Sequence, residues 1–178
     1  MVLPGHIAAG YLTALGVVTL SGLTLTPNEQ ITLLTLGALL GDGPDLDVFF
    51  SFLKKKTTSV TALTGHRDHI THIPLLWLAI GLFIFLLTDS NFGKVLGLLL
   101  WLCPWSHFVC DSIFSSVGIG WLKPFSKKEY TLFRRREFTL STWKNLWRHL
   151  LISPLFYLEI LLVIVAVIVF FIRNYLWI

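Results

Sequence analysis

Histidine and aspartate, side chains that readily bind divalent metals, are scarce in this chain and occur where its apolar segments begin or end. His6 begins the first apolar segment, and an aspartate-rich turn at residues 42–47 follows the second. A histidine cluster at residues 66–72 precedes the third segment, while His107 and Asp111 end the fourth. If these segments are antiparallel membrane helices, all of these groups lie at one end of a bundle. The pattern therefore predicts a metal site assembled from residues far apart in sequence.

The aspartate-rich turn offers two carboxylates that are separated by one residue. Asp45 and Asp47 lie in a stretch that Gly41, Gly43 and Pro44 prevent from continuing as a helix, so both can point toward one cation. Aspartates are also common in ordinary turns, which is the alternative interpretation. Asp42 is a further candidate ligand, or it caps the helix end or orients a neighbour.

The histidine cluster is the more specific motif. His66, His69 and His72 recur every three residues and lead into a helix, so they are expected within one face of it. Imidazole is a common ligand for zinc. Arg67 could hold a phosphate or a carboxylate. The alternative is an interfacial loop whose histidines are only solvated.

The fourth segment ends with an imidazole and a carboxylate four residues apart. His107 and Asp111 would share one helical face, a spacing that holds metals in helical bundles. Ionisable groups near a membrane helix are costly and therefore suggest function. The alternative is a His–Asp pair that helps the helix to pack. His6 is uninformative alone and gains meaning only because the topology brings it to the same end.

The composition is that of a membrane protein. Hydrophobic residues make up 54% of the chain and charged residues 13%, with a mean hydropathy of +0.74, whereas a soluble protein carries about a quarter charged residues. Residues 155–172 contain one charged side chain, Glu159, as expected of a transmembrane helix. We expect an all-α polytopic membrane bundle of about four to five helices with a metal site at one end. No cleavable signal peptide is expected, and Cys103 and Cys110 are too far apart on one helix to form a disulfide.

The chain is expected to form one membrane-embedded domain. Its apolar segments are predicted at residues 4–25, 29–40, 73–87, 92–112 and 150–172. We expect the metal-site helices at residues 1–112, a basic amphipathic cytoplasmic region at residues 113–149 and a final transmembrane helix at residues 150–173. Thr26 is a plausible N-cap and Pro27 a first helical residue. The second segment is too short to span a bilayer alone.

The basic residues predict an orientation. The chain has 14 Lys and Arg residues, and all but Lys94 and Arg173 lie in the loops before the third and fifth segments. The positive-inside rule places these loops and the candidate ligands on the cytoplasmic side of a bacterial inner membrane. The N-terminus would then be cytoplasmic and the C-terminus external.

Together these residues resemble the bacterial membrane-bound metal-dependent hydrolase family. The resemblance spans residues 1–126 in consistent order. It rests on His6, the Gly-x-Leu-x-x-x-Gly-Pro-Asp-Leu-Asp stretch at 37–47, His66-Arg67 with Thr71-His72, His107 with Asp111, and Gly120 with Pro124-Phe125-Ser126. That family is distantly similar to the helical zinc-dependent phospholipase C and nuclease superfamily.

The resemblance implies a phosphoester hydrolase with a multi-residue metal site. The implied ligands are His6, Asp45 or Asp47, His66, His72, His107 and Asp111. The chain departs from the family pattern where Asp68-His69 replaces a common Gly after His-Arg, and where Ile73 replaces a common Ser. The second His-x-x-x-Glu helix of the soluble enzymes has no clear counterpart. One or two metals, most simply zinc, are therefore expected rather than three.

The expected mechanism is metal-assisted hydrolysis at the cytoplasmic membrane surface. Asp45 or Asp47 would bridge metals or act as general base, and Arg67 would stabilise charge on the phosphate. The basic residues between positions 123 and 148 would attract anionic headgroups, which favours a phospholipid or lipid-linked phosphoester as substrate. Nucleic acid is an alternative partner. The rival functions are a non-catalytic membrane protein with a structural metal and a small metal or proton transporter.

Overall fold

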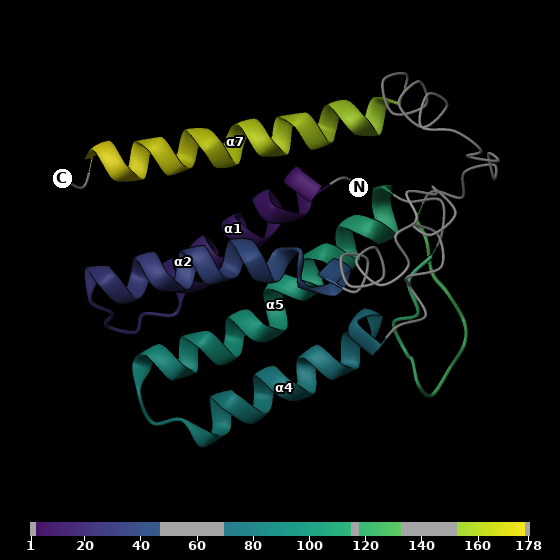
Figure 1. Ribbon diagram of the computed structural model, residues 1–178, viewed down its shortest axis with the longest axis horizontal. Helices are drawn as coiled ribbons and strands as arrows, with labels where there is room; N and C mark the ends of the chain where they lie inside the picture. The colour runs from purple at the N-terminus through teal and green to yellow at the C-terminus, as the bar shows by residue number, and fades with distance from the viewer. Residues whose placement is uncertain (1–2, 47–69, 115–117, 133–152, 177–178) are drawn as a thin grey trace, which may run out of the picture.

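The protein forms an all-α bundle whose long helices lie side by side, roughly along the long axis of the molecule (Figure 1). The computed structural model describes residues 3–46, 70–114, 118–132 and 153–176. Its long helices and two 3-10 turns are α1 (Leu3–Leu20), α2 (Pro27–Gly41), η1 (Gly43–Asp45), η4 (Ile70–His72), α4 (Pro74–Leu87), α5 (Asn91–Phe114) and α7 (Pro154–Leu176). The predicted membrane helical bundle is confirmed.

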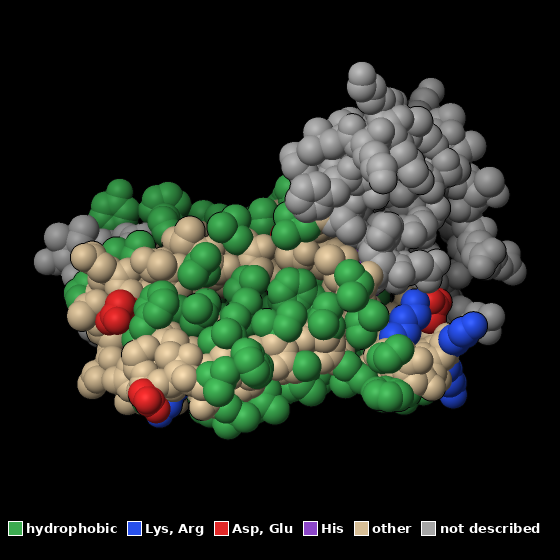
Figure 2. All heavy atoms as spheres, turned by 60° about the horizontal axis from the view of Figure 1, so that its bottom comes forward, with side chains coloured by type: hydrophobic (Ala, Val, Ile, Leu, Met, Phe, Trp, Pro, Cys, Tyr) green, Lys and Arg blue, Asp and Glu red, His purple; other side chains and the backbone are tan. Residues whose placement is uncertain are grey.

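Among the residues that the structure describes, three helices are long and apolar enough to cross a membrane: Leu3–Leu20, Asn91–Ile113 and Pro154–Arg173. Helix α4 is apolar but shorter. Helix α7 packs mainly on α1, where Phe170 contacts the ring of Tyr11 edge to face. Apolar side chains cover much of the bundle surface in Figure 2, as expected of a surface that faces lipid.

The boundary between α1 and α2 follows from local chemistry. Helix α1 ends at Leu20 instead of continuing to residue 25 as predicted, because Gly22 adopts a left-handed backbone with φ of 66°. Helix α2 begins with the predicted Thr26 cap and Pro27. The Thr26 hydroxyl accepts a hydrogen bond from the Glu29 N–H, and the Glu29 carboxylate accepts the Thr26 N–H at 2.7 Å. This capping box fixes the start of α2.

Small residues bring the helices into close contact. A methyl group added to Gly10 would lie 2.4 Å from the Gly37 carbonyl oxygen, and one added to Gly41 would lie 2.4 Å from the His6 carbonyl oxygen. The same type of approach joins α4 and α5 at Gly81 and Gly97. Close backbone packing of this kind is typical of membrane helices. It brings the beginning of α1 against the end of α2, where His6 lies.

The final helix begins at Pro154, four residues later than the predicted residue 150. Proline is favoured in the first turn because its missing N–H would have no partner there. Of the predicted basic amphipathic region at residues 113–149, the structure describes residues 113–114, which belong to α5, and residues 118–132, which form a hairpin closed by a β-bridge between Ile119 and Tyr130. Cys103 and Cys110 are free, in agreement with the prediction.

Candidate metal centre

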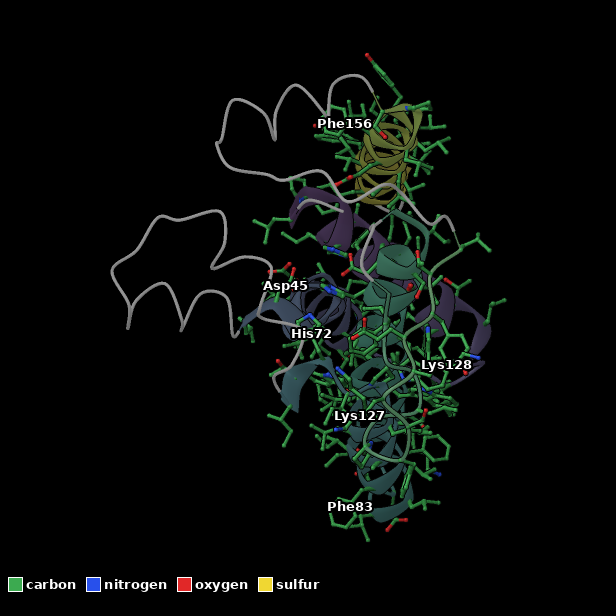
Figure 3. The ribbon with its side chains drawn as sticks, turned by 90° about the vertical axis from the view of Figure 1, so that its right-hand side faces the viewer. Asp45, His72, Phe83, Lys127, Lys128 and Phe156 are labelled. Carbon is green, nitrogen blue, oxygen red and sulfur yellow. The ribbon has the colours of Figure 1, made fainter. Side chains whose placement is uncertain are left out.

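Five of the predicted ligands converge at one end of the bundle. His6 lies in α1, Asp45 in η1, His72 in η4, and His107 and Asp111 near the end of α5. Figure 3 looks onto this end and shows Asp45 and His72 side by side. Because α1, α2, α4 and α5 alternate in direction (Figure 1), the start of one helix meets the end of the next. The topology thus collects polar residues that are up to about a hundred positions apart in the sequence.

The first group of potential ligands contains Asp45, His72 and His107. The Asp45 Oδ1 lies 3.2 Å from the His72 Nε2 and 3.6 Å from the His107 Nε2. Two ligands of a tetrahedral zinc, each bound at 2.0–2.1 Å, are separated by about 3.3 Å. Both distances from the Asp45 oxygen are therefore compatible with a zinc ion bound between this carboxylate and each histidine.

The second group contains His6, His107 and Asp111, and all three side chains are buried. The His6 Nε2 lies 3.5 Å from the Asp111 Oδ1. The rings of His6 and His107 stack with centroids 3.7 Å apart and planes 18° apart. The Nδ1 of His6 is buried and has no hydrogen-bond partner among the described residues. A buried polar atom of this kind is costly unless a ligand satisfies it.

His107 belongs to both groups, and a backbone carbonyl defines its orientation. Its Nδ1 lies 3.0 Å from the carbonyl oxygen of Gly41, the last residue of α2. A carbonyl can only accept, so Nδ1 carries the proton and Nε2 retains the lone pair. Carbonyls at the end of a helix lack a partner within the helix, and metal-binding histidines commonly donate their other N–H in this way. The Gly41 carbonyl was not predicted, because a backbone acceptor has no side-chain signature.

Asp42 lies beside this cluster as the C-cap of α2. Burial, and secondly the Asp45 carboxylate, raise the pKa of its carboxyl to about 6, while His6 acts in the opposite direction. Its backbone N–H bonds to the carbonyls of Leu39 and Leu40, so its capping interactions come from the backbone. Asp42 is therefore near the candidate ligands without belonging to either group.

Four predicted site residues, Asp47, His66, Arg67 and His69, lie outside the described residues. The third histidine of that cluster, His72, lies in the separate turn η4 and not on a helix face. His72 thus precedes the helix of the third segment as predicted, and the expectation that the three histidines share one face stays a prediction. Pro74 explains the break, because proline restricts the preceding residue, and Ile73 has an extended backbone.

Aromatic residues pack around the candidate ligands. Phe108 contacts the rings of His72 and His107, with centroids 6.1 and 5.7 Å apart. Trp121 packs edge to face against both Phe108 and Trp105. Trp105 and Trp121 thus form an aromatic wall beside the site. That wall limits water around the imidazoles and strengthens their electrostatic interactions.

Comparisons with known proteins assign the chain to a family. Neither the curated proteins nor the solved structures contain a match. The YdjM inner membrane protein family matches all of residues 1–178. Its description agrees with the three apolar helices, each long enough to cross a membrane. The chain therefore belongs to the YdjM inner membrane protein family.

Proposed function

We propose that the protein is a membrane-bound, metal-dependent hydrolase that cleaves a phosphoester of a lipid or lipid-linked substrate at the cytoplasmic surface of the inner membrane. One observation carries the proposal. Asp45, His72 and His107 offer three potential ligand atoms within 4.8 Å of one another at the end of the bundle. Two imidazoles and one carboxylate also occur as the protein ligands of catalytic zinc, which leaves a coordination position for water or substrate.

The chemistry divides between the ion and the protein. A zinc ion held by these residues would supply an activated water and polarise a phosphoryl oxygen. Asp45 is the most accessible of the ligands, with 26% of its side chain exposed, whereas the side chains of His72 and His107 are buried. A carboxylate has two oxygens, so Asp45 can bind through one and accept a proton at the other. Asp47 and Arg67 remain candidates for the roles of second base and phosphate ligand.

The position of the site favours a substrate from the membrane surface. His6 is the fourth residue of α1, and Asp111 is three residues from the end of α5, so the ligands lie near helix ends and not at mid-membrane depth. This position argues against the transporter alternative. Lys123, Lys127 and Lys128 follow α5 at the same end and favour anionic headgroups. The positive-inside rule places this end in the cytoplasm, with several helices crossing the membrane.

A structural metal is the second candidate function. His6, His107 and Asp111 are each at most 3% exposed, and closed sites of this kind stabilise folds rather than admit substrate. His107 offers only one lone pair while its Nδ1 donates to Gly41, so the two groups compete for it. An ion in the buried group would connect α1 to α5 without catalysis.

The test uses the purified full-length chain in detergent, with zinc content and hydrolysis of bis(p-nitrophenyl) phosphate and of phosphatidylglycerol measured in parallel. We expect Asp45→Asn to lower hydrolysis at least about 100-fold. The zinc would lose a carboxylate ligand, and the water that it activates would lose its general base. Asp89→Asn, an exposed aspartate in the turn between α4 and α5, is the matched control and should keep full activity. Bound zinc without hydrolysis of either substrate would instead support the structural site.

A further inference from the structure

Residues 118–132 form a hairpin beyond the end of α5 that is held by backbone hydrogen bonds. Ile119 and Tyr130 exchange two backbone hydrogen bonds of 2.9 and 3.0 Å, and the Ile119 side chain is buried. Within the turn, the Lys123 N–H bonds to the Gly120 carbonyl. This hairpin is a defined surface and not merely a connection between helices.

Ser112 attaches the hairpin to α5. Its backbone carbonyl accepts the Leu132 N–H at 2.8 Å and the Thr131 hydroxyl at 3.2 Å. Its own hydroxyl accepts the Trp121 indole N–H at 3.1 Å. The attachment point is the residue after Asp111, so the hairpin is held next to the candidate metal centre. In Figure 1 it runs from the end of α5 past the beginning of α4.

The outer surface of the hairpin combines large apolar side chains with lysines. Phe125 is 88% exposed and Leu122 is 49% exposed. Lys127 and Lys128 follow directly, and the Lys128 Nζ lies 5.2 Å from the centre of the Tyr130 ring. Figure 2 shows basic and apolar side chains gathered at this end of the bundle. Single exposed apolar residues are ordinary, but an exposed phenylalanine beside lysines at the end of a membrane helix is typical of an interfacial segment.

We propose that the 118–132 hairpin is an interfacial anchor that inserts Phe125 and Leu122 into the headgroup layer and binds anionic phospholipid through Lys127 and Lys128. The membrane is the nearest large partner, because the hairpin follows α5, a candidate span, within a few residues. A bilayer surface supplies both an apolar layer for the phenyl ring and negative charge for the lysines. A binding site for a protein partner would not have to lie next to the end of a membrane helix, as this hairpin does.

The anchor also fixes the height of the candidate metal centre above the lipid. Trp121 of the hairpin packs on Phe108, whose ring contacts His72 and His107. Insertion of Phe125 therefore holds the ligand cluster at a constant distance from the headgroups. This inference does not depend on the proposed hydrolysis, since it concerns where the hairpin lies and not what the site does.

The test measures the depth of a nitroxide label in the full-length chain reconstituted in nanodiscs. The label is placed at Phe125→Cys, after Cys103 and Cys110 are replaced by alanine, and its collisions with oxygen and with a water-soluble nickel complex are compared. Glu129→Cys on the same hairpin is the control for an aqueous position. In discs containing 30% phosphatidylglycerol, we expect the oxygen-to-nickel ratio at Phe125 to exceed the control several-fold.

The lysines are tested with the same label. Lys127→Gln with Lys128→Gln should lower the lipid-immersed fraction in anionic discs, by roughly fivefold for each lysine near the surface. Lys94→Gln, at the opposite end of the bundle, should leave it unchanged. A label at Phe125 that is accessible to nickel in anionic discs would overturn the proposal. So would a label shielded from both reagents, which would mean that protein covers the hairpin, or an immersion depth independent of lipid charge.

Discussion

The two ends of the bundle differ in how their polar side chains are arranged. At the end formed by the α1–α2 and α4–α5 turns, polar side chains pair with one another. Glu29 and Thr26 complete the capping box, the Asn91 side chain donates to Thr24 at 2.9 and 3.0 Å, and Arg173 donates to Gln30. At the other end, imidazoles and carboxylates gather around common points with separations of 3.2–3.6 Å.

This difference suggests that the turn end contributes to the stability of the fold, whereas the end that holds the candidate ligands could bind an ion. Paired groups at the turn end satisfy their own hydrogen bonds and fix how the helices are connected. At the ligand end, the buried Nδ1 of His6 and Nε2 of His107 have no hydrogen-bond partner among the described residues. Unsatisfied groups of this kind destabilise the apo fold and are compensated when a ligand binds. The proposed cation would satisfy these atoms at the ligand end, whereas the polar groups named above at the turn end already pair with one another.

The largest effect is expected from His107→Ala, which removes the residue common to both ligand groups. Zinc affinity should fall at least about 100-fold, because loss of a direct ligand exceeds the 10–100-fold cost of losing an outer partner. We expect zinc to raise the melting temperature of the wild-type chain, and this increase should disappear in the variant. Thermal unfolding in detergent with and without zinc checks this.

The control for His107→Ala is Leu99→Ala, a core truncation on the same helix. It should lower the melting temperature but preserve the zinc-dependent increase. If zinc raises the melting temperature of His107→Ala as much as that of Leu99→Ala, His107 is not a zinc ligand.

A smaller effect is expected where close packing positions the ligand end. In Gly10→Ala the added methyl group would lie 2.4 Å from the Gly37 carbonyl oxygen, so α1 and α2 must separate. We expect a loss of about 1–3 kcal/mol in the free energy of unfolding. Gly16→Ala is the matched control, because a methyl group there meets no atom within 4 Å. Equal stability of the two variants in chemical denaturation would contradict the packing proposed for this crossing.

At the turn end, Thr26→Ala removes the side-chain half of the capping box. We expect it to cost about 1 kcal/mol of stability, in the usual range for a lost N-cap. Zinc affinity should not change, since α2 would still end at Gly41. Isothermal titration with zinc, beside denaturant unfolding, checks both points. A drop in zinc affinity as large as that of His107→Ala would show that the two ends are coupled.

The smallest effect is expected from Arg173→Ala, which removes the contact between α7 and Gln30 of α2. A hydrogen bond to a partly exposed charged group contributes about 0.5–1 kcal/mol or less. A double-mutant cycle with Gln30→Ala isolates this pair from other contacts of α7. A coupling energy of zero would mean that α7 is held by its packing on α1 alone.

Much of the fold follows from local sequence signals. Pro74 starts α4 one residue after the predicted residue 73, Thr26 and Pro27 give the start of α2, and the apolar runs identify the other helices. The end of α1 was misplaced because Gly22 stops a run whose hydrophobicity continues to Leu25. Hydrophobicity alone does not report backbone conformation.

The sequence predicted which residues come together at the candidate site, but not how their side chains are arranged. The alternating direction of the helices is enough to bring His6 and His107 to one end. The stacking of their rings, the Gly41 carbonyl behind His107 and the attachment of the hairpin to Ser112 depend on tertiary packing. None of these leaves a spacing or composition pattern that sequence alone could reveal.

The most direct test of a metal at the ligand end is X-ray absorption at the zinc edge of the purified, zinc-loaded chain. We expect a first shell of nitrogen and oxygen only, at 2.0–2.1 Å, with the outer scattering of at least two imidazoles. His107→Ala should lose that imidazole signal. A spectrum with sulfur at about 2.3 Å would assign the metal to Cys103 or Cys110 instead. That result, or a wild-type chain that retains no zinc, would contradict a metal site formed by the histidines and aspartates at this end of the bundle.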